Sequence, residues 1–138
     1  MVSLFLLLVS CNEKAKPVVS FYYWKTIFKL SETEKETINE NNVRKIYIRY
    51  FDIDLNPNNE NPIPLTPVRF QEPMNNFDVV PVVYIKNKVM LKQNIDLEDL
   101  AHKTIKLITE INSKNKIYNK EIQIDCDWTL SSKDNYLR

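Results

Sequence analysis

The feature that most constrains this chain is the absence of glycine. None of its 138 residues is Gly, whereas average usage of about 7% predicts roughly ten. Glycine-rich loops let a backbone approach a phosphate closely, so G-x-x-x-x-G-K-[ST] and G-x-G-x-x-G loops do not occur here. We therefore exclude nucleotide-binding enzymes of those kinds. We also expect Asn, which is common in the sequence, to supply most residues with positive φ.

Charge and metal-binding residue types narrow the function further. The 19 basic and 18 acidic side chains give a net charge of +1, which offers no overall attraction for nucleic acid. One histidine, His102, and two cysteines, Cys11 and Cys126, cannot form a multi-histidine zinc site or a four-thiolate cluster within the chain. We expect no cofactor and no metal, and we expect His102 to be a solvated or packing residue.

The amino terminus has the pattern of an export signal. Residues 4–9 are an apolar run, too short for a membrane span of about 20 residues but suited to a signal peptide. The run ends in Leu8-Val9-Ser10-Cys11, which resembles the bacterial lipobox. This resemblance implies a signal peptide over residues 1–10, a diacylated Cys11, and a tether over 11–17 that holds the chain in the bacterial cell envelope. The alternative is a buried strand with an ordinary thiol.

Four segments rich in β-branched and aromatic residues predict strands. They are residues 18–24, 45–54, 78–85 and 121–128. The third is almost continuously apolar, as in a parallel strand covered on both faces. Pro81 within it cannot donate a ladder hydrogen bond, so we expect that strand to be irregular or at an edge.

Capping residues predict helices between these strands. Ser31-Glu32-Thr33-Glu34 is a capping-box pattern and predicts a helix over residues 32–41. Asp96 precedes a longer amphipathic pattern that ends near Ser113, and Ser131 or Ser132 predicts another cap. The apolar stripe of the longer pattern consists of Leu97, Leu100, Ala101, Ile105, Ile108 and Ile111.

The alternation of strands and helices predicts an α/β fold, with a parallel sheet and right-handed crossover helices over residues 18–138. The link from Leu55 to Asn76 is the exception, because it contains five prolines and shows no helical period. Loops of this length are usually functional or mobile. We expect an extended lid or rim beside a site, or else a crossover that the pattern does not reveal.

Polar and aromatic residues collect at the predicted carboxyl ends of the strands, where ligands bind in parallel α/β folds. Two aspartates end the second strand and two end the fourth, and residues two apart share a face of a strand. Glycoside hydrolysis uses paired carboxylates, and aromatic rings suit stacking on sugars. We expect catalytic roles for Asp125 and Asp127. We expect substrate binding by Trp24, Asp52, Asp54, Tyr84 and Trp128.

A structural interpretation of these carboxylates stays open beside the functional one. Inward aspartates often pair with basic side chains or backbone amides, and Arg49 and Lys25 are candidate partners. Carboxylates with aromatic residues also coordinate Ca²⁺, but the chain contains no D-x-[DN]-x-[DN]-G loop.

The same segments carry a family resemblance. Residues 21–25, 47–54, 80–85 and 121–129 look like the amino-terminal half of a group of uncharacterised envelope lipoproteins with a glycoside-hydrolase-like (β/α)₈ barrel. The last segment is also similar, more distantly, to the chitinase-like strand D-x-x-D-x-D-x-E. Asp125 and Asp127 match its last two aspartates, whereas Thr129 stands where that family has its acid Glu.

The resemblance implies the first four β/α units of a truncated TIM-like barrel, because eight units need about 250 residues. It implies a carbohydrate partner and a membrane reached through the lipid anchor, with neither nucleic acid nor nucleotide. Three function classes remain open. They are a carbohydrate-active envelope enzyme, a non-catalytic glycan-binding lipoprotein, and an interaction protein whose acidic strand ends only satisfy internal basic groups.

Overall fold

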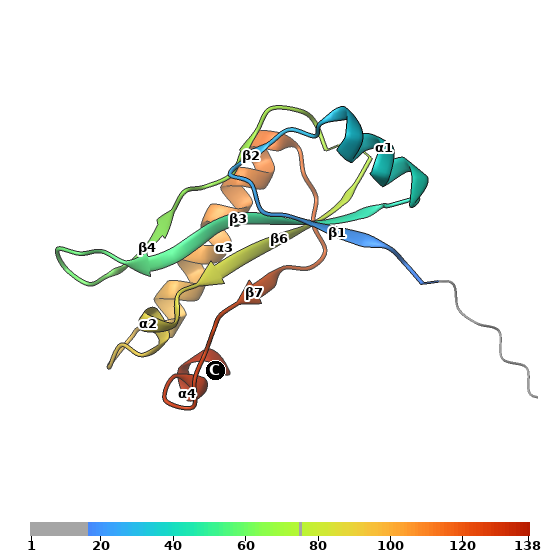
Figure 1. Ribbon diagram of the computed structural model, residues 1–138. Coiled ribbons are helices and arrows are strands. Elements are labelled where there is room, and N and C mark those ends of the chain that lie inside the picture. Colours follow the sequence, from blue (N-terminus) through green and yellow to red (C-terminus); the bar gives the residue numbers. More distant parts are fainter. Residues whose placement is uncertain (1–16, 75) are drawn as a thin grey trace, which may run out of the picture.

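A computed structural model describes residues 17–74 and 76–138, so the predicted signal peptide and Cys11 lie outside the described residues. The elements follow one another along the chain as Figure 1 shows. The strands are β1 (Ser20–Tyr23), β2 (Ile27–Phe28), β3 (Lys45–Leu55), β4 (Pro62–Leu65), β5 (Arg69–Phe70), β6 (Asp78–Ile85) and β7 (Gln123–Asp125). The helices are α1 (Glu32–Glu40), α2 (Asn87–Met90), α3 (Leu97–Asn115) and α4 (Lys133–Tyr136).

The main sheet has the predicted parallel arrangement. Its order is β1-β3-β6-β7, and each neighbouring pair on this path is parallel. The four predicted strands are thus confirmed, although the fourth is shorter than expected and ends at Asp125. Within the described residues the sheet is open, because β1 and β7 each pair on one side only. The fold of the described residues is therefore α/β, with a mostly parallel and open sheet.

The two faces of the sheet differ in what they carry. One hydrophobic cluster joins alternate residues of β3 and β6, such as Ile46, Ile48 and Val79, to α1 through Ile38 and to α3 through Ile108. We call this the helix face. Strand alternation and register place the remaining side chains on the opposite face, which we call the open face. It carries Tyr22, Tyr47, Arg49, Asp52, Tyr84, Gln123 and Asp125.

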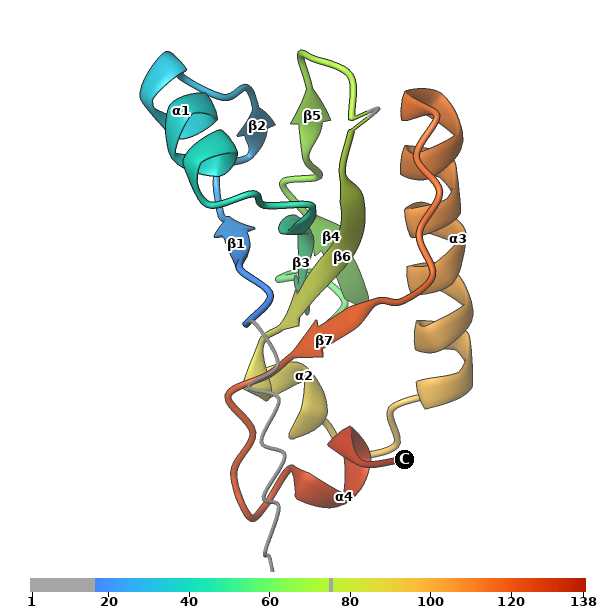
Figure 2. The same cartoon turned by 90° about the vertical axis from the view of Figure 1, so that its right-hand side faces the viewer.

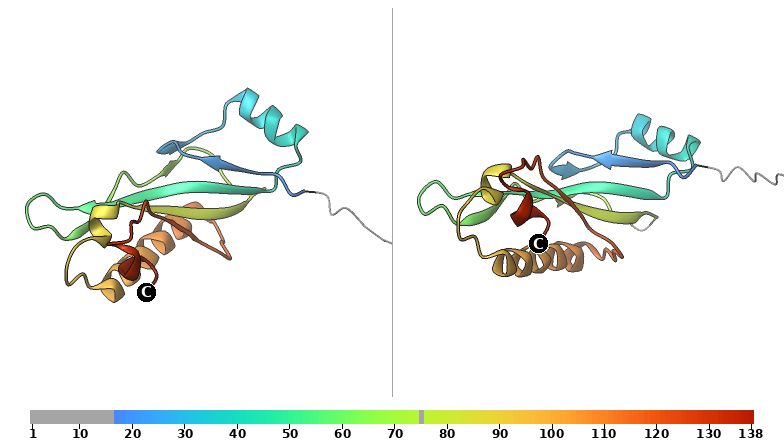
Figure 3. Two further views of the ribbon diagram at one scale, coloured as in Figure 1. Left: turned by 60° about the horizontal axis from the view of Figure 1, so that its bottom comes forward. Right: turned by 90° about the horizontal axis from the view of Figure 1, so that it is seen from below.

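The two principal helices begin where their caps predict. Ser31 and Glu34 form the full capping box of α1, and the Asp96 side chain accepts from the backbone N–H of Asp99 at the start of α3. Figures 2 and 3 show α1 beside β1 and α3 along the β6 side of the sheet. The predicted apolar stripe of α3 is partly wrong, since Ala101 and Ile105 are exposed whereas Thr104 and Asn112 are buried. His102 is exposed, as one of its two expected roles requires.

The proline-rich link is fixed to the sheet and is not a free lid. β4 pairs antiparallel with residues Asp52–Leu55 of β3, and β5 pairs parallel with β2. The described residues of this link form no helix, which agrees with the lack of helical period in the sequence. Its two short strands were not predicted, because they contain only a few residues each and prolines interrupt the first.

Pro81 lies in an interior strand, so the alternative of an edge strand is wrong. β6 pairs with β3 along its whole length, but its pairing with β7 begins only at Val82. β6 is therefore unpaired on its β7 side at Pro81. No N–H group is needed there to donate to β7, so the proline is tolerated. The irregularity lies in β3, whose register shifts between Arg49 and Phe51.

Positive φ angles are shared between Asn and other residue types. Among the described residues, Asn42 and Asn94 adopt them, but so do Glu60, Thr66 and Lys116. The prediction that Asn supplies most of them is therefore only partly right. Lys116 ends α3 in the left-handed conformation that Gly usually occupies at this position. None of the helices in the described part of the chain has the length and apolar character needed to span a bilayer.

Candidate functional site

A cavity on the open face lies at the carboxyl ends of the parallel strands. Its volume is about 570 Å³. Five predicted site residues line it: Trp24, Asp52, Tyr84, Asp125 and Asp127. Arg49, Cys126 and Tyr136 complete the lining. The sheet thus brings together side chains that lie up to 112 positions apart in the sequence.

A β-bulge in β3 places the side chains of Arg49 and Asp52 on the same face of the sheet, where both line the cavity. The register shift leaves Tyr50 without a partner in β6, so that Arg49 pairs with Val82 and Phe51 pairs with Val83. Without the extra residue, Arg49 and Asp52 would project from opposite faces, because their separation is odd. The bulge puts both on the open face, where Arg49 Nε donates to Asp52 Oδ1 at 2.7 Å. A second bond joins Arg49 Nη2 to Asp52 Oδ2 and makes the contact bidentate.

The two predicted catalytic aspartates occupy different local structures. Asp125 ends β7, whereas Asp127 lies beyond the strand, yet both line the cavity. Asp127 Oδ2 accepts a 2.7 Å hydrogen bond from the Tyr84 hydroxyl, and this bond is the main reason that the pKa of Tyr84 is raised to about 12. Asp125 Oδ1 accepts from the Gln123 side-chain amide at 2.7 Å. Both carboxylates are therefore oriented by neutral donors.

Aromatic rings form one wall of the site and continue away from it. Trp24 is 52% exposed and stacks on Tyr22, with centroids 5.6 Å apart and an interplanar angle of 9°. Tyr22 in turn stacks on Tyr47 of the neighbouring strand at 4.7 Å. On the other side, Trp128 does not line the cavity, but it stacks at 6.2 Å on Tyr136, which does.

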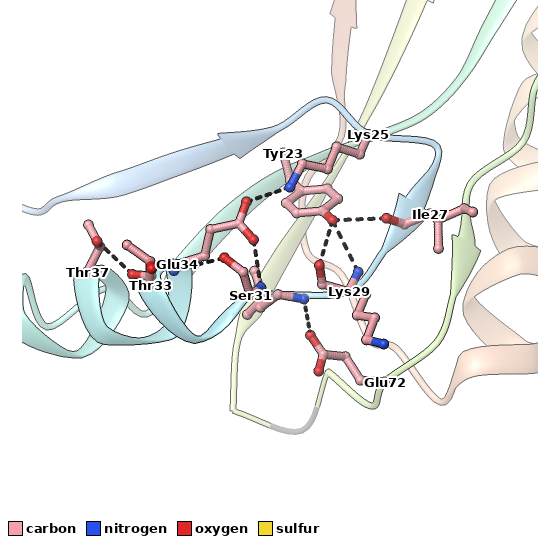
Figure 4. A network of polar contacts seen from close by, with 10 residues as sticks. Tyr23, Lys25, Ile27, Lys29, Ser31, Thr33, Glu34, Thr37 and Glu72 are labelled. Atoms are coloured by element: carbon pink, nitrogen blue, oxygen red, sulfur yellow. Dashed lines mark hydrogen bonds and ion pairs between the residues drawn. The ribbon is translucent and has the colours of Figure 1, made fainter.

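The segment that carries Trp24 is held by the polar network of Figure 4. The Tyr23 hydroxyl donates to a backbone oxygen of the following turn, that of Ile27 at 2.9 Å, and accepts from the Lys29 N–H. Lys25 Nζ contacts Glu34 Oε1 at 2.8 Å. Because Tyr23 and Lys25 flank Trp24, these contacts fix the backbone on both sides of the tryptophan.

Asp54 is not brought into the cavity. Its carboxylate contacts Lys86 Nζ at 2.7 Å and Lys88 Nζ at 2.6 Å, and it accepts from the Leu55 N–H. The hydrogen bond from Lys86, followed by that from Lys88, holds the pKa of Asp54 well below its usual range. Asp54 therefore follows the structural interpretation, as an ion-paired residue at the end of β3.

Sequence reasoning did not assign three of the lining residues to the site. Arg49 was considered only as a partner for an aspartate, and its place in the cavity depends on the bulge, which no sequence pattern marks. Tyr136 comes from the last helix, and its hydroxyl donates to the Ile124 backbone oxygen at 2.9 Å. Burial raises the pKa of the Cys126 thiol, with a further contribution from Asp127. The position of Cys126 in the sequence, between Asp125 and Asp127, is the signal that could have placed it in the site.

A second groove, of about 490 Å³, lies on the helix face between β4 and α3. Its floor is apolar, with Phe51, Ile53 and Leu100, and its charged residues lie mainly on the exposed turns of α3. Among the described residues that line it, Phe51 is the one aromatic residue, and none is a predicted site residue. We therefore place the candidate site on the open face.

Comparison of the chain with protein-family models, with curated proteins and with solved structures finds no match. The chemistry of the cavity must therefore be inferred from its own side chains. Within residues 17–74 and 76–138, no three His, Cys, Asp or Glu side chains are grouped so that they could hold a metal ion.

Proposed function

We propose that the chain binds carbohydrate in the cavity on the open face, as part of an envelope lipoprotein with a glycoside-hydrolase-like domain. The observation that carries the proposal is the convergence of Trp24, Tyr84 and Tyr136 with three aspartates in one cavity of about 570 Å³. Aromatic faces pack against the C–H groups of a sugar ring, while carboxylates accept from its hydroxyls. These are the two kinds of contact that a sugar requires.

The strand order supports the barrel part of the proposal. A singly wound barrel needs parallel strands whose spatial order equals their chain order, and β1-β3-β6-β7 has that property. The side chains of the two outer strands also meet over the open face, where the Tyr22 hydroxyl donates to Gln123 Oε1 at 2.9 Å. In a flat sheet, three strand spacings would separate these strands by about 14 Å. We propose that the sheet is the first half of an eight-stranded barrel.

In an enzyme, Asp127 would act as acid, base or electrostatic stabiliser beside Asp125. Tyr84 would orient its carboxylate, and among the described residues only one of the two Asp127 oxygens is hydrogen-bonded. Thr129 stands at the position of the chitinase-like acid and offers a hydroxyl in place of a carboxyl group. Its N–H donates to Ser132 Oγ at 2.8 Å. Non-catalytic glycan binding is the second candidate, because each lining carboxylate already has a side-chain partner.

Asp127→Asn separates these two candidates. If the protein is an enzyme, this variant abolishes turnover of neutral, reducing-end-labelled oligosaccharides while their binding is retained, because the amide keeps an acceptor for Tyr84. Asp78→Asn is the matched control, since Asp78 is exposed at the opposite end of β6. Undiminished turnover in Asp127→Asn would contradict the catalytic assignment. Binding without turnover in the unaltered protein would support the second candidate.

The lipid anchor is tested apart from the site. We propose that Cys11 is diacylated and holds the protein in the cell envelope. In bacteria that express the full chain, Cys11→Ser should move the protein from the membrane fraction to the soluble fraction and remove the acyl mass from its amino-terminal peptide. An unchanged distribution and an unacylated peptide in the unaltered protein would contradict the lipobox interpretation.

A further inference from the structure

The cavity on the open face carries an excess of negative charge. Its lining contains three aspartates and one arginine. Arg49 binds Asp52 in a bidentate contact, so its charge is matched within the pair. Asp125 and Asp127 accept only from neutral groups among the described residues, a side-chain amide and a tyrosine hydroxyl. Two carboxylate charges therefore remain for a ligand to neutralise.

The lysines of neighbouring segments do not supply that neutralisation. Lys25, next to Trp24, contacts Glu34 at 2.8 Å. Lys86 and Lys88, which follow β6, both contact Asp54. None of the three lines the cavity. A bound sugar would thus meet a site whose own charges repel anions and attract cations.

The geometry favours an organic cation over a metal ion. A metal ion needs several ligand atoms around one point, and in the described part of the chain no three acidic, His or Cys side chains are grouped in this way. An ammonium group does not need several ligand atoms around one point, because single carboxylates and the faces of aromatic rings both stabilise it. Trp24 provides such a face in the lining and is 52% exposed.

From these observations, and resting on the carbohydrate binding proposed above, we propose that the cavity selects sugars that carry a free, protonated amine over neutral and acidic sugars. The amine lies against Asp125 and Asp127, and both the amine and the adjoining sugar ring lie over the face of Trp24. Neutral sugars keep the ring contact and lose the charge contact. Uronic acids place a carboxylate where two carboxylates already lie.

The test compares three tetramers with the same full-length protein. They are a glucosamine tetramer, its fully N-acetylated counterpart and a galacturonic acid tetramer. Binding is followed by tryptophan fluorescence and calorimetry at about pH 6, where a primary amine is protonated. We expect the glucosamine tetramer to bind about tenfold more tightly than the N-acetylated one, a size typical of a few partly exposed charge and cation–π contacts. We expect the galacturonic acid tetramer to bind most weakly.

Salt and a charge-removing variant identify the source of the preference. Raising the salt from about 0.05 M to about 0.5 M should reduce the preference for the amine to about twofold, because screening weakens exposed charge pairs. Asp125→Asn should reduce it in low salt as well, whereas Asp78→Asn should not. If Asp125→Asn fails to fold, the comparison of tetramers at two salt concentrations in the unaltered protein still decides the matter.

The outcomes separate this inference from the proposed function. Equal binding of the glucosamine and N-acetylated tetramers, or tighter binding of the galacturonic acid tetramer, overturns the amine preference and leaves carbohydrate binding in place. A preference for the amine that salt does not change also overturns it, since charge would not be the cause. Failure of all three tetramers to bind contradicts both proposals.

Discussion

At the scale of single residues, Glu34 links a helix cap to the segment that carries Trp24. Its Oε2 accepts from the Ser31 N–H at 2.7 Å, which completes the capping box of α1. Its Oε1 contacts Lys25 at 2.8 Å. The hydrogen bond from Lys25, followed by that from the Ser31 backbone, lowers the pKa of Glu34 from 4.5 to about 2. The charged carboxylate is therefore favoured by folding.

The effect on stability has a defined pH dependence. A lowered pKa in the folded state contributes stability that is fully present above pH 4.5 and is lost as the pH falls toward about 2. Glu34→Gln keeps the geometry of a capping box but removes the charge. We expect it to lower the free energy of unfolding at about pH 7 by on the order of 1 kcal/mol or less, because the side chain is partly exposed.

Urea denaturation at about pH 7 and about pH 2 measures this difference. The difference between Glu34→Gln and the unaltered protein should become small at the lower pH, where about half of the folded molecules have a protonated Glu34. Glu36→Gln is the control, since Glu36 lies exposed on the same helix, and it should show little change at either pH. A difference between Glu34→Gln and the unaltered protein that persists undiminished at the lower pH would contradict the assignment.

At the scale of elements, the fold was more predictable than the site. Runs such as residues 78–85 predicted parallel strands because burial on both faces leaves a continuous apolar pattern. Ser31 and Asp96 predicted helix starts because their side chains meet local backbone donors. The bulge at Tyr50 was not predictable, because it depends on how β3 pairs with β6. The place of Arg49 in the cavity was unpredictable for the same reason.

The same bulged residue attaches α3 to the sheet. Tyr50 is fully buried, and its hydroxyl donates to Asn112 Oδ1 of α3 at 2.7 Å. Burial raises the pKa of Tyr50 well above its usual range. Neither partner was predicted in this contact, since the apolar period of the helix gives no signal for a buried Asn.

Tyr50→Phe should therefore destabilise the protein. The substitution removes the Tyr50 hydroxyl and leaves Asn112 Oδ1 buried without this hydrogen-bond donor. We expect the free energy of unfolding to fall by about 1–3 kcal/mol. Tyr22→Phe is the matched control, because its hydroxyl bonds Gln123 at an exposed position, and it should cost less than about 0.5 kcal/mol. Thermal or urea denaturation measures both. Equal effects of the two variants would contradict the role given to the buried bond.

At the scale of the whole molecule, the described sheet has two unpaired edges. The outer sides of β1 and β4, which both pair with β3, form one edge, and the outer side of β7 forms the other. Neither edge has a strand partner among residues 17–74 and 76–138. Two exposed apolar residues directly precede β1 in the sequence: Val18 is 85% exposed and Val19 is 38% exposed. Unpaired strand edges with apolar neighbours promote association between chains.

We expect this 138-residue chain, when isolated, to associate in a concentration-dependent way. Val19→Lys places a charge beside the β1 edge, a device by which natural proteins limit edge pairing, and it should shift the chain toward the monomer in sedimentation velocity. Leu130→Lys replaces another exposed apolar residue away from the strand edges, and it should have a smaller effect. A chain that stays monomeric at every concentration would contradict the expectation.

The cavity on the open face should bind sugar, and the two tryptophans allow this to be observed directly. The chain has two tryptophans, so its indole N–H groups give two NMR signals, and Trp24→Phe assigns them. On titration with the glucosamine tetramer or its N-acetylated counterpart, the Trp24 signal should shift strongly and saturate. The Trp128 signal should shift less, because Trp128 does not line the cavity and reaches it only through its stack on Tyr136. If neither signal moves with either tetramer at about 10 mM, where even weak binding of millimolar Kd is seen, the account of this cavity is wrong.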